Sequence, residues 1–148
     1  MRTLFDRTCR TDVLARLERV QAEARPRWGR MSAPRMVVHL GDQMRMTLGS
    51  APWTRMPGLV RYPGYKQAAL YWLPWPKSGI QGPPEAFLTA PTDWDADRAA
   101  LVQLVERLAA RGPEGRWPDH SHFGSLSGRQ WGVFCYRHFD HHLRQFDA

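Results

Sequence analysis

The stretch from Ser127 to Phe146 limits the fold of this chain most strongly, because it has the pattern of one long helix with histidines on its buried face. Ser127 and Gln130 have the spacing of a capping box, in which each side chain satisfies a free backbone N–H of the first turn. Counted by the helical period, one side of this helix carries six residues, namely Trp131, Phe134, Cys135, His138, His142 and Phe146. The segment therefore predicts a packed helix with polar groups facing inward.

Two of these histidines have the spacing of metal ligands. His138 and His142 are four residues apart, so a helix brings both imidazoles within reach of one ion. Neutral imidazole is the commonest side-chain ligand for metals such as zinc. A third ligand is needed, and His39 is our candidate because MVVHLGDQM is the only other histidine-bearing stretch with a helical pattern. The sequence predicts a three-histidine site; the alternative is a set of hydrogen-bonded core or surface histidines.

Residues near this pair receive separate expectations. His141 points about 80° away from the centre of the buried stripe, so we expect it to flank the site. Cys135 lies one turn before His138 and can approach a metal, but a small core residue is the favoured interpretation. Asp140 and Gln145 are candidates to accept a hydrogen bond from a ligand imidazole and so fix its tautomer.

Chain length and cysteine content favour one intracellular domain. The 148 residues can bury one core, so we expect a single domain over residues 1–148. The two cysteines, Cys9 and Cys135, are far apart and form no CxxC motif, which suits a reducing compartment. No run approaches the ~18 apolar residues of a membrane span, and MRTLFDRTCRTD lacks the apolar core of a signal peptide. We expect a cytoplasmic protein without membrane contact.

The net charge of +7 raises the question of an anionic partner. Of the 21 basic residues, 19 are arginine, but they are dispersed and often face Asp or Glu within predicted helices. A nucleic-acid interface would show a clustered basic face interleaved with aromatic residues. We therefore expect no nucleic-acid partner, and anionic small molecules remain as substrates.

Four segments have the pattern of amphipathic helices, at residues 11–24, 33–48, 92–111 and 127–146. Thr11 is the expected N-cap of the first and Pro26 ends it, while Ser32 caps the second and Gly49 stops it. Residues 50–92 hold eight of the twelve prolines, and their tryptophans argue against disorder. We expect an ordered crossover there, with a short helical stretch around 65–73, which either forms a lid or covers the core. The pattern predicts an all-α, up-down four-helix bundle with a long Pro/Trp-rich crossover between its second and third helices.

Four motifs, in this order, resemble the DinB-like branch of the DinB/YfiT superfamily, in particular its domain-of-unknown-function group. They are RWGRMSAPRMVVHLGDQMRMTLG, LPWPK, HSHFGSLSGRQWG and YRHFDHHLRQF, and the likeness covers nearly the whole chain. It implies a four-helix bundle whose three histidines hold a divalent metal, and these fall on His39, His138 and His142. The usual HPxFG motif lacks its proline at His120 to Gly124, which implies a looser turn. His120 and His122 stand two residues apart in that loop, and we expect no metal role for them.

The resemblance implies enzymes of two kinds, metal-dependent hydrolases and transferases or isomerases that use a low-molecular-weight thiol. Three histidines leave an open position, at which zinc lowers the pKa of water toward ~7 or binds a thiolate. We expect zinc or nickel, with iron or manganese as alternatives, a small thiol or anionic substrate, and pairing as a homodimer. Arg45 and Arg137 are candidates to hold an anion, and no catalytic residue is assigned. The competing hypothesis is a non-catalytic small-ligand-binding or stress-related protein with a structural or vestigial metal.

Overall fold

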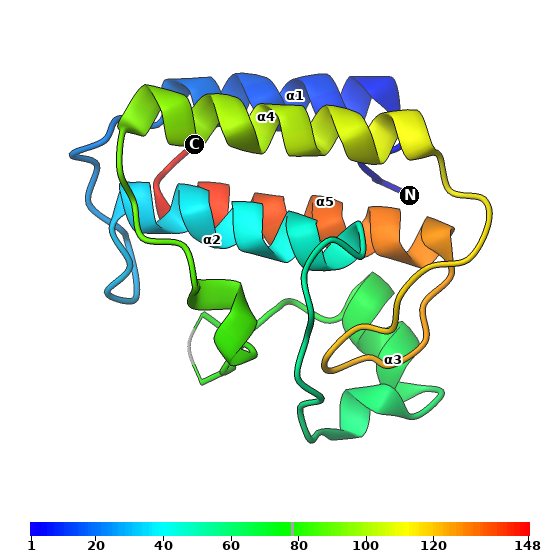
Figure 1. Cartoon of the computed structure of the whole chain (residues 1–148). Coiled ribbons are helices and arrows are strands. Elements are labelled where there is room, and N and C mark those ends of the chain that lie inside the picture. Colours follow the sequence, from blue (N-terminus) through cyan, green and yellow to red (C-terminus); the bar gives the residue numbers. More distant parts are fainter. Residues whose placement is uncertain (78) are drawn as a thin grey trace.

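The computed structural model describes residues 1–77 and 79–148, and these residues form an all-helical structure without a β-strand. The four long helices are α1 (Arg7–Arg19), α2 (Ala33–Thr47), α4 (Trp94–Arg111) and α5 (Gly128–Gln145). Figure 1 shows α1 and α4 in one layer over α2 and α5, with the crossover on the far side of α2 and α5. The prediction of an all-α chain is confirmed.

Side-chain caps fix the boundaries of two helices where the sequence predicts them. Ser127 accepts a hydrogen bond from the Gln130 backbone N–H at 3.3 Å, and the Gln130 side chain accepts one from the Ser127 N–H at 2.9 Å. This reciprocal pair is the predicted capping box of α5. Ser32 caps α2 by accepting one hydrogen bond, from the Arg35 N–H at 3.3 Å, and Gly49, with φ of 75°, ends the helix. The Ser50 N–H then reaches back to the Arg45 carbonyl at 2.9 Å, as in a Schellman motif.

The predicted boundaries of α1 are wrong at both ends. The helix begins at Arg7, four residues before the expected cap Thr11, because the Asp6 side chain accepts a hydrogen bond from the Cys9 N–H at 2.8 Å. It ends at Arg19, because Val20 adopts an extended conformation (φ −70°, ψ 131°) while its side chain stays buried in the core. A β-branched residue suits extended backbone, so no proline is required to end this helix.

The four long helices enclose one apolar core. α2 packs along α4 and also contacts α5, which in turn packs on α1. Ion pairs at 3.5 Å, Arg98 with Glu18 and Arg10 with Glu106, link α4 to α1. Pairs with such exposed carboxylates contribute about 0–1 kcal/mol each, whereas burying one Leu or Val side chain contributes about 1.5–3 kcal/mol. The helix arrangement therefore depends mainly on the buried stripes, including Val13, Leu17, Val37, Leu40, Met44, Leu101, Leu104, Val105 and Leu108.

The crossover contributes short helical turns that cover α2 and α5. These are η1 (Leu59–Arg61), α3 (Tyr65–Gln67), η2 (Ala68–Trp72) and η3 (Pro84–Phe87). α3 and η2 occupy the part for which the sequence predicts a helical stretch. η2 packs on α5, and η3 packs on α2. Because α4, α5 and η3 all pack against α2, 12 of its 15 residues are buried. In the part of the chain described, no helix combines the length and apolar character that crossing a bilayer requires.

Candidate metal centre

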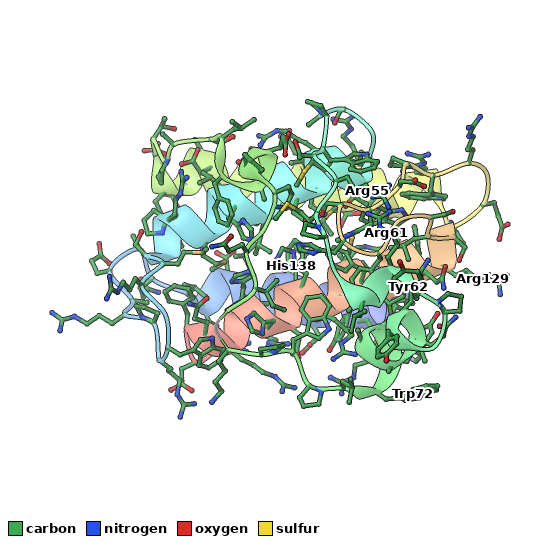
Figure 2. All side chains as sticks on the ribbon, turned by 90° about the horizontal axis from the view of Figure 1, so that it is seen from below. Arg55, Arg61, Tyr62, Trp72, Arg129 and His138 are labelled. Atoms are coloured by element: carbon green, nitrogen blue, oxygen red, sulfur yellow. The ribbon has the colours of Figure 1, made fainter. Side chains whose placement is uncertain are left out.

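Three histidines from two helices meet beneath the crossover. His39 comes from α2, and His138 and His142 come from one face of α5. The Nε2 atom of His138 lies 3.2 Å from Nε2 of His39 and 3.1 Å from Nε2 of His142. One nitrogen from each ring lies within 4.8 Å of the others, a group that can hold a metal ion. Figure 2 views the molecule from the side of the crossover and shows His138 between α2 and α5, near the centre of the picture.

The outer nitrogens of two rings are held by acceptors that fix their tautomers. His39 Nδ1–H donates to the Ala86 carbonyl at 2.8 Å. His142 Nδ1–H donates to Gln145 Oε1 at 3.0 Å, and Gln145 Nε2 donates to the Trp28 carbonyl at 2.8 Å, which orients the amide. Because both Nδ1 atoms carry the proton, both Nε2 atoms present a free lone pair to the centre, as metal ligands do.

His138 lies between these two lone pairs and lacks a complete set of partners. Its Nδ1 atom is buried and has no hydrogen-bond partner among the described residues. If His138 carries its proton on Nε2, this proton can hydrogen-bond well to the Nε2 atom of only one neighbouring histidine. If it carries the proton on Nδ1, the three Nε2 lone pairs face one another. A cation bound to all three Nε2 atoms stabilises this second arrangement. Metal–nitrogen bonds of about 2.0–2.1 Å in a tetrahedral site place the nitrogens about 3.3–3.4 Å apart. The two pairs that include His138 are close to this, at 3.1 and 3.2 Å, and all three nitrogens lie within 4.8 Å of one another.

Burial keeps the three rings neutral. It lowers the pKa of His39, and together with the neighbouring histidines it lowers the pKa of His138 well below its ordinary value. Burial also lowers the pKa of His142 to about 3. Because a metal ligand must be unprotonated, rings that remain neutral at physiological pH are ready to coordinate. His138 is the most accessible of the three, since His39 and His142 are buried and His138 is half-buried.

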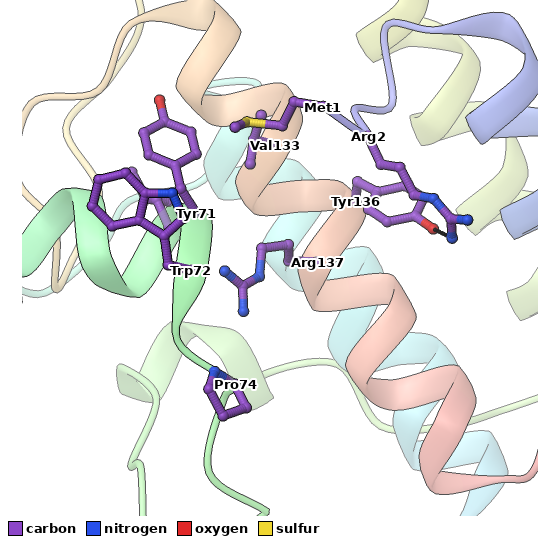
Figure 3. A pocket seen from close by; sticks show the side chains of 9 residues that line it. Met1, Arg2, Tyr71, Trp72, Pro74, Val133, Tyr136 and Arg137 are labelled. Atoms are coloured by element: carbon purple, nitrogen blue, oxygen red, sulfur yellow. Dashed lines mark hydrogen bonds between the residues drawn. The ribbon is translucent and has the colours of Figure 1, made fainter.

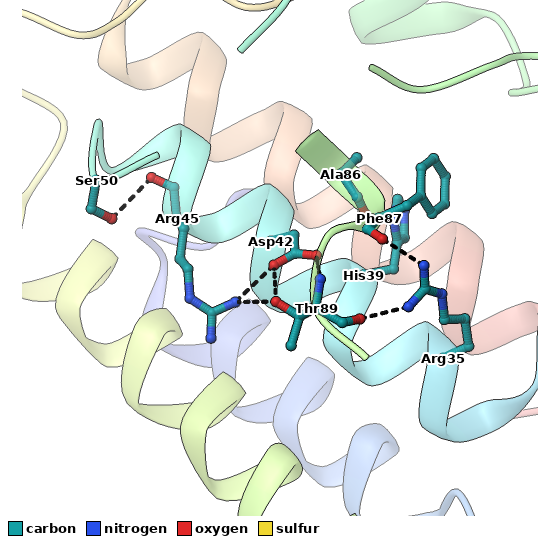
Figure 4. A network of polar contacts seen from close by, with 8 residues as sticks. All are labelled: Arg35, His39, Asp42, Arg45, Ser50, Ala86, Phe87 and Thr89. Carbon is teal, nitrogen blue, oxygen red and sulfur yellow. Dashed lines mark hydrogen bonds and ion pairs between the residues drawn. The ribbon is translucent and has the colours of Figure 1, made fainter. Parts of the chain in front are cut away.

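A buried carboxylate on α2 holds the crossover in place over this group. Asp42 accepts hydrogen bonds from both the N–H (2.9 Å) and the hydroxyl of Thr89, and it pairs with Arg45 at 2.9 Å. Its exposed fraction is 5%. Although the helical pattern alone favours a polar, solvent-facing turn at Asp42, the residue is buried, because residues 86–89 cover this side of α2 (Figure 4). Arg45 is also engaged here, so nothing supports its expected role as an anion ligand.

Residues 86–89 of the crossover also position the carbonyl that orients His39. Arg35 donates to the carbonyls of Phe87 and Thr89, each at 2.6 Å, from one turn before His39 on α2. These bonds hold the segment that also carries the Ala86 carbonyl, which accepts from His39, and the Phe87 ring, which stacks on the imidazole with centroids 4.7 Å apart and planes at 14°. The crossover therefore both orients a ligand and covers it.

Of the three flanking residues of α5, only Gln145 hydrogen-bonds to a histidine of the site. Gln145 bonds to His142, as the sequence predicts. Asp140 does not contact a ligand imidazole; it pairs with Arg16 at 2.8 Å and with Arg144 at 3.0 Å. That expectation for Asp140 is wrong, because Arg16 of α1 draws the carboxylate toward the other side of α5. His141 is half-buried and lies outside the three-histidine group.

Cys135 and Gln43 face the core and not the centre. Cys135 is 1% exposed with its Sγ 3.8 Å from the Thr47 hydroxyl, and burial raises the pKa of its thiol to about 12. A thiol that stays protonated is a poor ligand and a poor nucleophile. Gln43 Nε2 donates to Thr47 within α2 at 3.3 Å and does not contact a histidine.

His120 and His122 lie outside the metal centre, in the loop before α5. His120 Nδ1 accepts hydrogen bonds from the N–H groups of His122 (3.0 Å) and Phe123 (3.3 Å). The backbones of His120 and Gly124 also bond in both directions, at 2.7 and 2.8 Å. The expected loosening of this turn is wrong, since the imidazole closes it without a proline at position 121. Burial lowers the pKa of His120 to about 3.

Sequence reasoning misses the partners that the crossover supplies. The Ala86 carbonyl is 47 residues from His39, and a backbone acceptor leaves no signature in the residue type. Thr89 opposite Asp42 is equally remote. Only the long spacing rich in proline and tryptophan indicated that the crossover had a defined structure.

Comparisons with known proteins give a family but no activity. No curated protein and no solved structure matches the chain. One family, described as a protein of unknown function (DUF1569), matches residues 5–148. Because this match includes nearly the entire length, as well as all three converging histidines, the chain belongs to the DUF1569 family.

Proposed function

We propose that this chain binds one divalent metal ion, zinc or nickel with iron or manganese as alternatives, through His39, His138 and His142. We further propose that residues 1–148 are one four-helix-bundle domain of the DinB/YfiT superfamily. The four sequence motifs and the arrangement of the long helices support this assignment. The same resemblance supports a homodimer, and two unpaired cysteines are compatible with a cytoplasmic location.

The observation that carries the metal proposal is that the Nε2 atoms of three histidines converge, while hydrogen bonds fix the proton on the Nδ1 atoms of two of them. His138 Nε2 lies 3.2 and 3.1 Å from its neighbours, and the Ala86 carbonyl and the Gln145 amide hold the outer protons of His39 and His142. Histidines that served only to fill the core would not need their lone pairs directed at one another. Such oriented imidazoles are typical of metal ligands.

The donor set supports an open coordination position. Among the described residues, no fourth His, Cys, Asp or Glu joins the group. When bound, a divalent ion with a free position supplies a water of lowered pKa or binds a substrate thiolate. The chain itself keeps the ligands neutral and oriented, and Phe87 and Trp75 form an apolar approach beside His39 and His138. We propose a hydrolase or a low-molecular-weight-thiol transferase acting on a small thiol or anion.

One observation favours the second candidate, a non-catalytic ligand-binding or stress-related protein with a structural or vestigial metal. Phe87 stacks directly on His39, and Trp75 lies with its centroid 6.1 Å from that of His138, so aromatic rings narrow the approach. Substitution with cobalt(II) separates the two candidates. A thiol that enters an open position produces a sulfur-to-cobalt charge-transfer band, whereas a closed site leaves the spectrum unchanged.

Elemental analysis of purified, tag-free protein tests the metal site itself. We expect about one equivalent of a divalent metal in the wild type and its loss in His39→Ala and His138→Ala. His141→Ala is the matched control, because this histidine is adjacent on α5 but lies outside the group. A wild-type protein that binds no metal even after reconstitution would refute the proposal, as would equal losses in all three variants.

A further inference from the structure

A hollow of about 300 Å³ lies on another face of α5, between this helix and η2. Figure 3 shows it from close by. It is lined by Met1, Arg2, Leu70, Tyr71, Trp72, Pro74, Val133, Tyr136 and Arg137. The lining is apolar except for two guanidinium groups and two tyrosines. A volume of this size lies at the lower end of small-molecule pockets.

The positive charge of the hollow is not neutralised. Arg137 donates to the carbonyls of Ala69 (3.1 Å) and Leu73, which are uncharged acceptors. Among the described residues, no carboxylate lies within ion-pair distance of Arg137 or Arg2. The nearby Asp140 is engaged by other arginines. Arg137 is also partly shielded from water, so its remaining N–H donors and its charge favour an anion in the hollow.

Tyr136 and Arg2 pair with each other at one end of the hollow. The Tyr136 hydroxyl oxygen accepts a hydrogen bond from Arg2 Nη1 at 2.8 Å, and Figure 3 shows this hydroxyl directed away from Trp72, so Arg137 is the polar group nearest the apolar wall. The opposite wall is apolar, with the Trp72 side chain 73% exposed and therefore free to cover a ligand. Figure 3 shows the Arg137 guanidinium directed into the space between Trp72 and Pro74. The hollow thus joins a cationic fork to aromatic and aliphatic surface.

We propose that this hollow binds a small amphipathic carboxylate. The planar guanidinium of Arg137 pairs with the carboxylate, and the apolar part of the ligand rests against Trp72 and Val133. The apolar walls favour an aryl or alkyl acid over a fully hydrated anion such as phosphate, and the volume suits a small acid. This site is separate from the metal centre, and the proposal does not depend on the proposed function.

The probe is 3-phenylpropanoate, titrated by NMR chemical-shift mapping into the metal-free His39→Ala protein. Because His39→Ala removes a metal ligand, the carboxylate of the probe cannot bind a metal there, and the chemical-shift changes report binding in the hollow. We expect shifts confined to the residues that line the hollow. Arg137→Gln in this background should weaken binding about 10- to 100-fold, because the ligand loses charge-assisted hydrogen bonds. The neutral 3-phenylpropanamide should bind the unsubstituted hollow more weakly by a similar factor.

Two further variants separate binding from folding. Arg129→Gln is the matched control on α5, because its exposed side chain pairs with Glu114 at 3.7 Å and lies outside the hollow; its affinity should not change. Trp72→Ala removes only an exposed ring, so it should fold normally and still weaken binding. No binding up to the solubility limit would overturn the proposal. Equal affinity for acid and amide, or equal losses in Arg129→Gln and Arg137→Gln, would also overturn it.

Discussion

Replacing Gln145 with alanine should weaken metal binding without removing a ligand. In the structure Gln145 is 5% exposed and joins two groups, accepting a hydrogen bond from His142 Nδ1 and donating one to the Trp28 carbonyl. Without it, no amide oxygen holds the proton on the outer nitrogen of His142. The imidazole is then free to exchange tautomers and to rotate, and its Nε2 lone pair is directed to the centre for only part of the time.

Two magnitudes follow from these contacts. Loss of an outer hydrogen-bond partner of a ligand imidazole reduces metal affinity about 10- to 100-fold, equivalent to about 1.4–2.7 kcal/mol at 25 °C. Separately, the His142 N–H and the Trp28 carbonyl lose a buried partner, which costs the metal-free fold about 1–3 kcal/mol. The metal affinity and the stability of Gln145→Ala should therefore both fall, and they are measured by different experiments.

Competition with a chromophoric zinc chelator near neutral pH measures the affinity, and urea unfolding of the metal-free protein measures the stability. Gln43→Ala is the matched control, since Gln43 is 7% exposed and bonds only to Thr47 within α2. Both variants should lose stability, but Gln43→Ala should bind zinc as the wild type does. Equal weakening in both variants would show that general loosening, and not the orientation of His142, controls affinity. Unchanged zinc binding in Gln145→Ala would refute the orientation argument directly.

Two further predictions concern stability. Burial lowers the pKa values of His120 and His142 to about 3 in the fold, below the unfolded value of about 6.5, so unfolding takes up protons in acid. Each of these histidines should therefore lower the stability of the metal-free protein by about 2 kcal/mol as the pH falls from about 8 to about 5. Urea midpoints that do not change with pH would contradict this. Gly132→Ala should lower the melting temperature, because its Cβ would lie 2.3 Å from Thr3 Oγ1, whereas Gly41→Ala, with its nearest neighbour at 3.5 Å, should be neutral or stabilising by calorimetry.

The sequence was most informative where local chemistry decides the structure. Ser127 with Gln130 forms the capping box, Ser32 caps α2, and the helical period brings His138 and His142 onto one face. It failed at α1, where Asp6 and Thr11 were both chemically suitable caps and only tertiary packing selects between them. Helix propensity and capping cannot resolve such a choice, because the energies of alternative caps differ by about 1 kcal/mol or less.

The polar groups around the centre were predicted less well, because their burial depends on the crossover. Asp42 has the position of a surface residue on an amphipathic helix until residues 86–89 cover it. Likewise, the periodicity of α5 cannot show that Asp140 forms an ion pair with Arg16 and does not hydrogen-bond to a histidine. Long-range pairings of this kind follow from the placement of one segment on another, and single-sequence patterns do not contain that placement.

The energetics of the three histidines argue that their arrangement reflects a ligand. Converging lone pairs destabilise the metal-free fold, and so does the buried His138 Nδ1, which has no hydrogen-bond partner in the described part of the chain, since each unsatisfied buried polar group costs about 1–3 kcal/mol. Apolar side chains of similar size would fill the same space at lower cost. A cation at the centre removes the repulsion and, because it binds the folded state and not the unfolded chain, adds its binding free energy to stability. The same geometry that weakens the metal-free protein therefore predicts a large rise in melting temperature on metal addition.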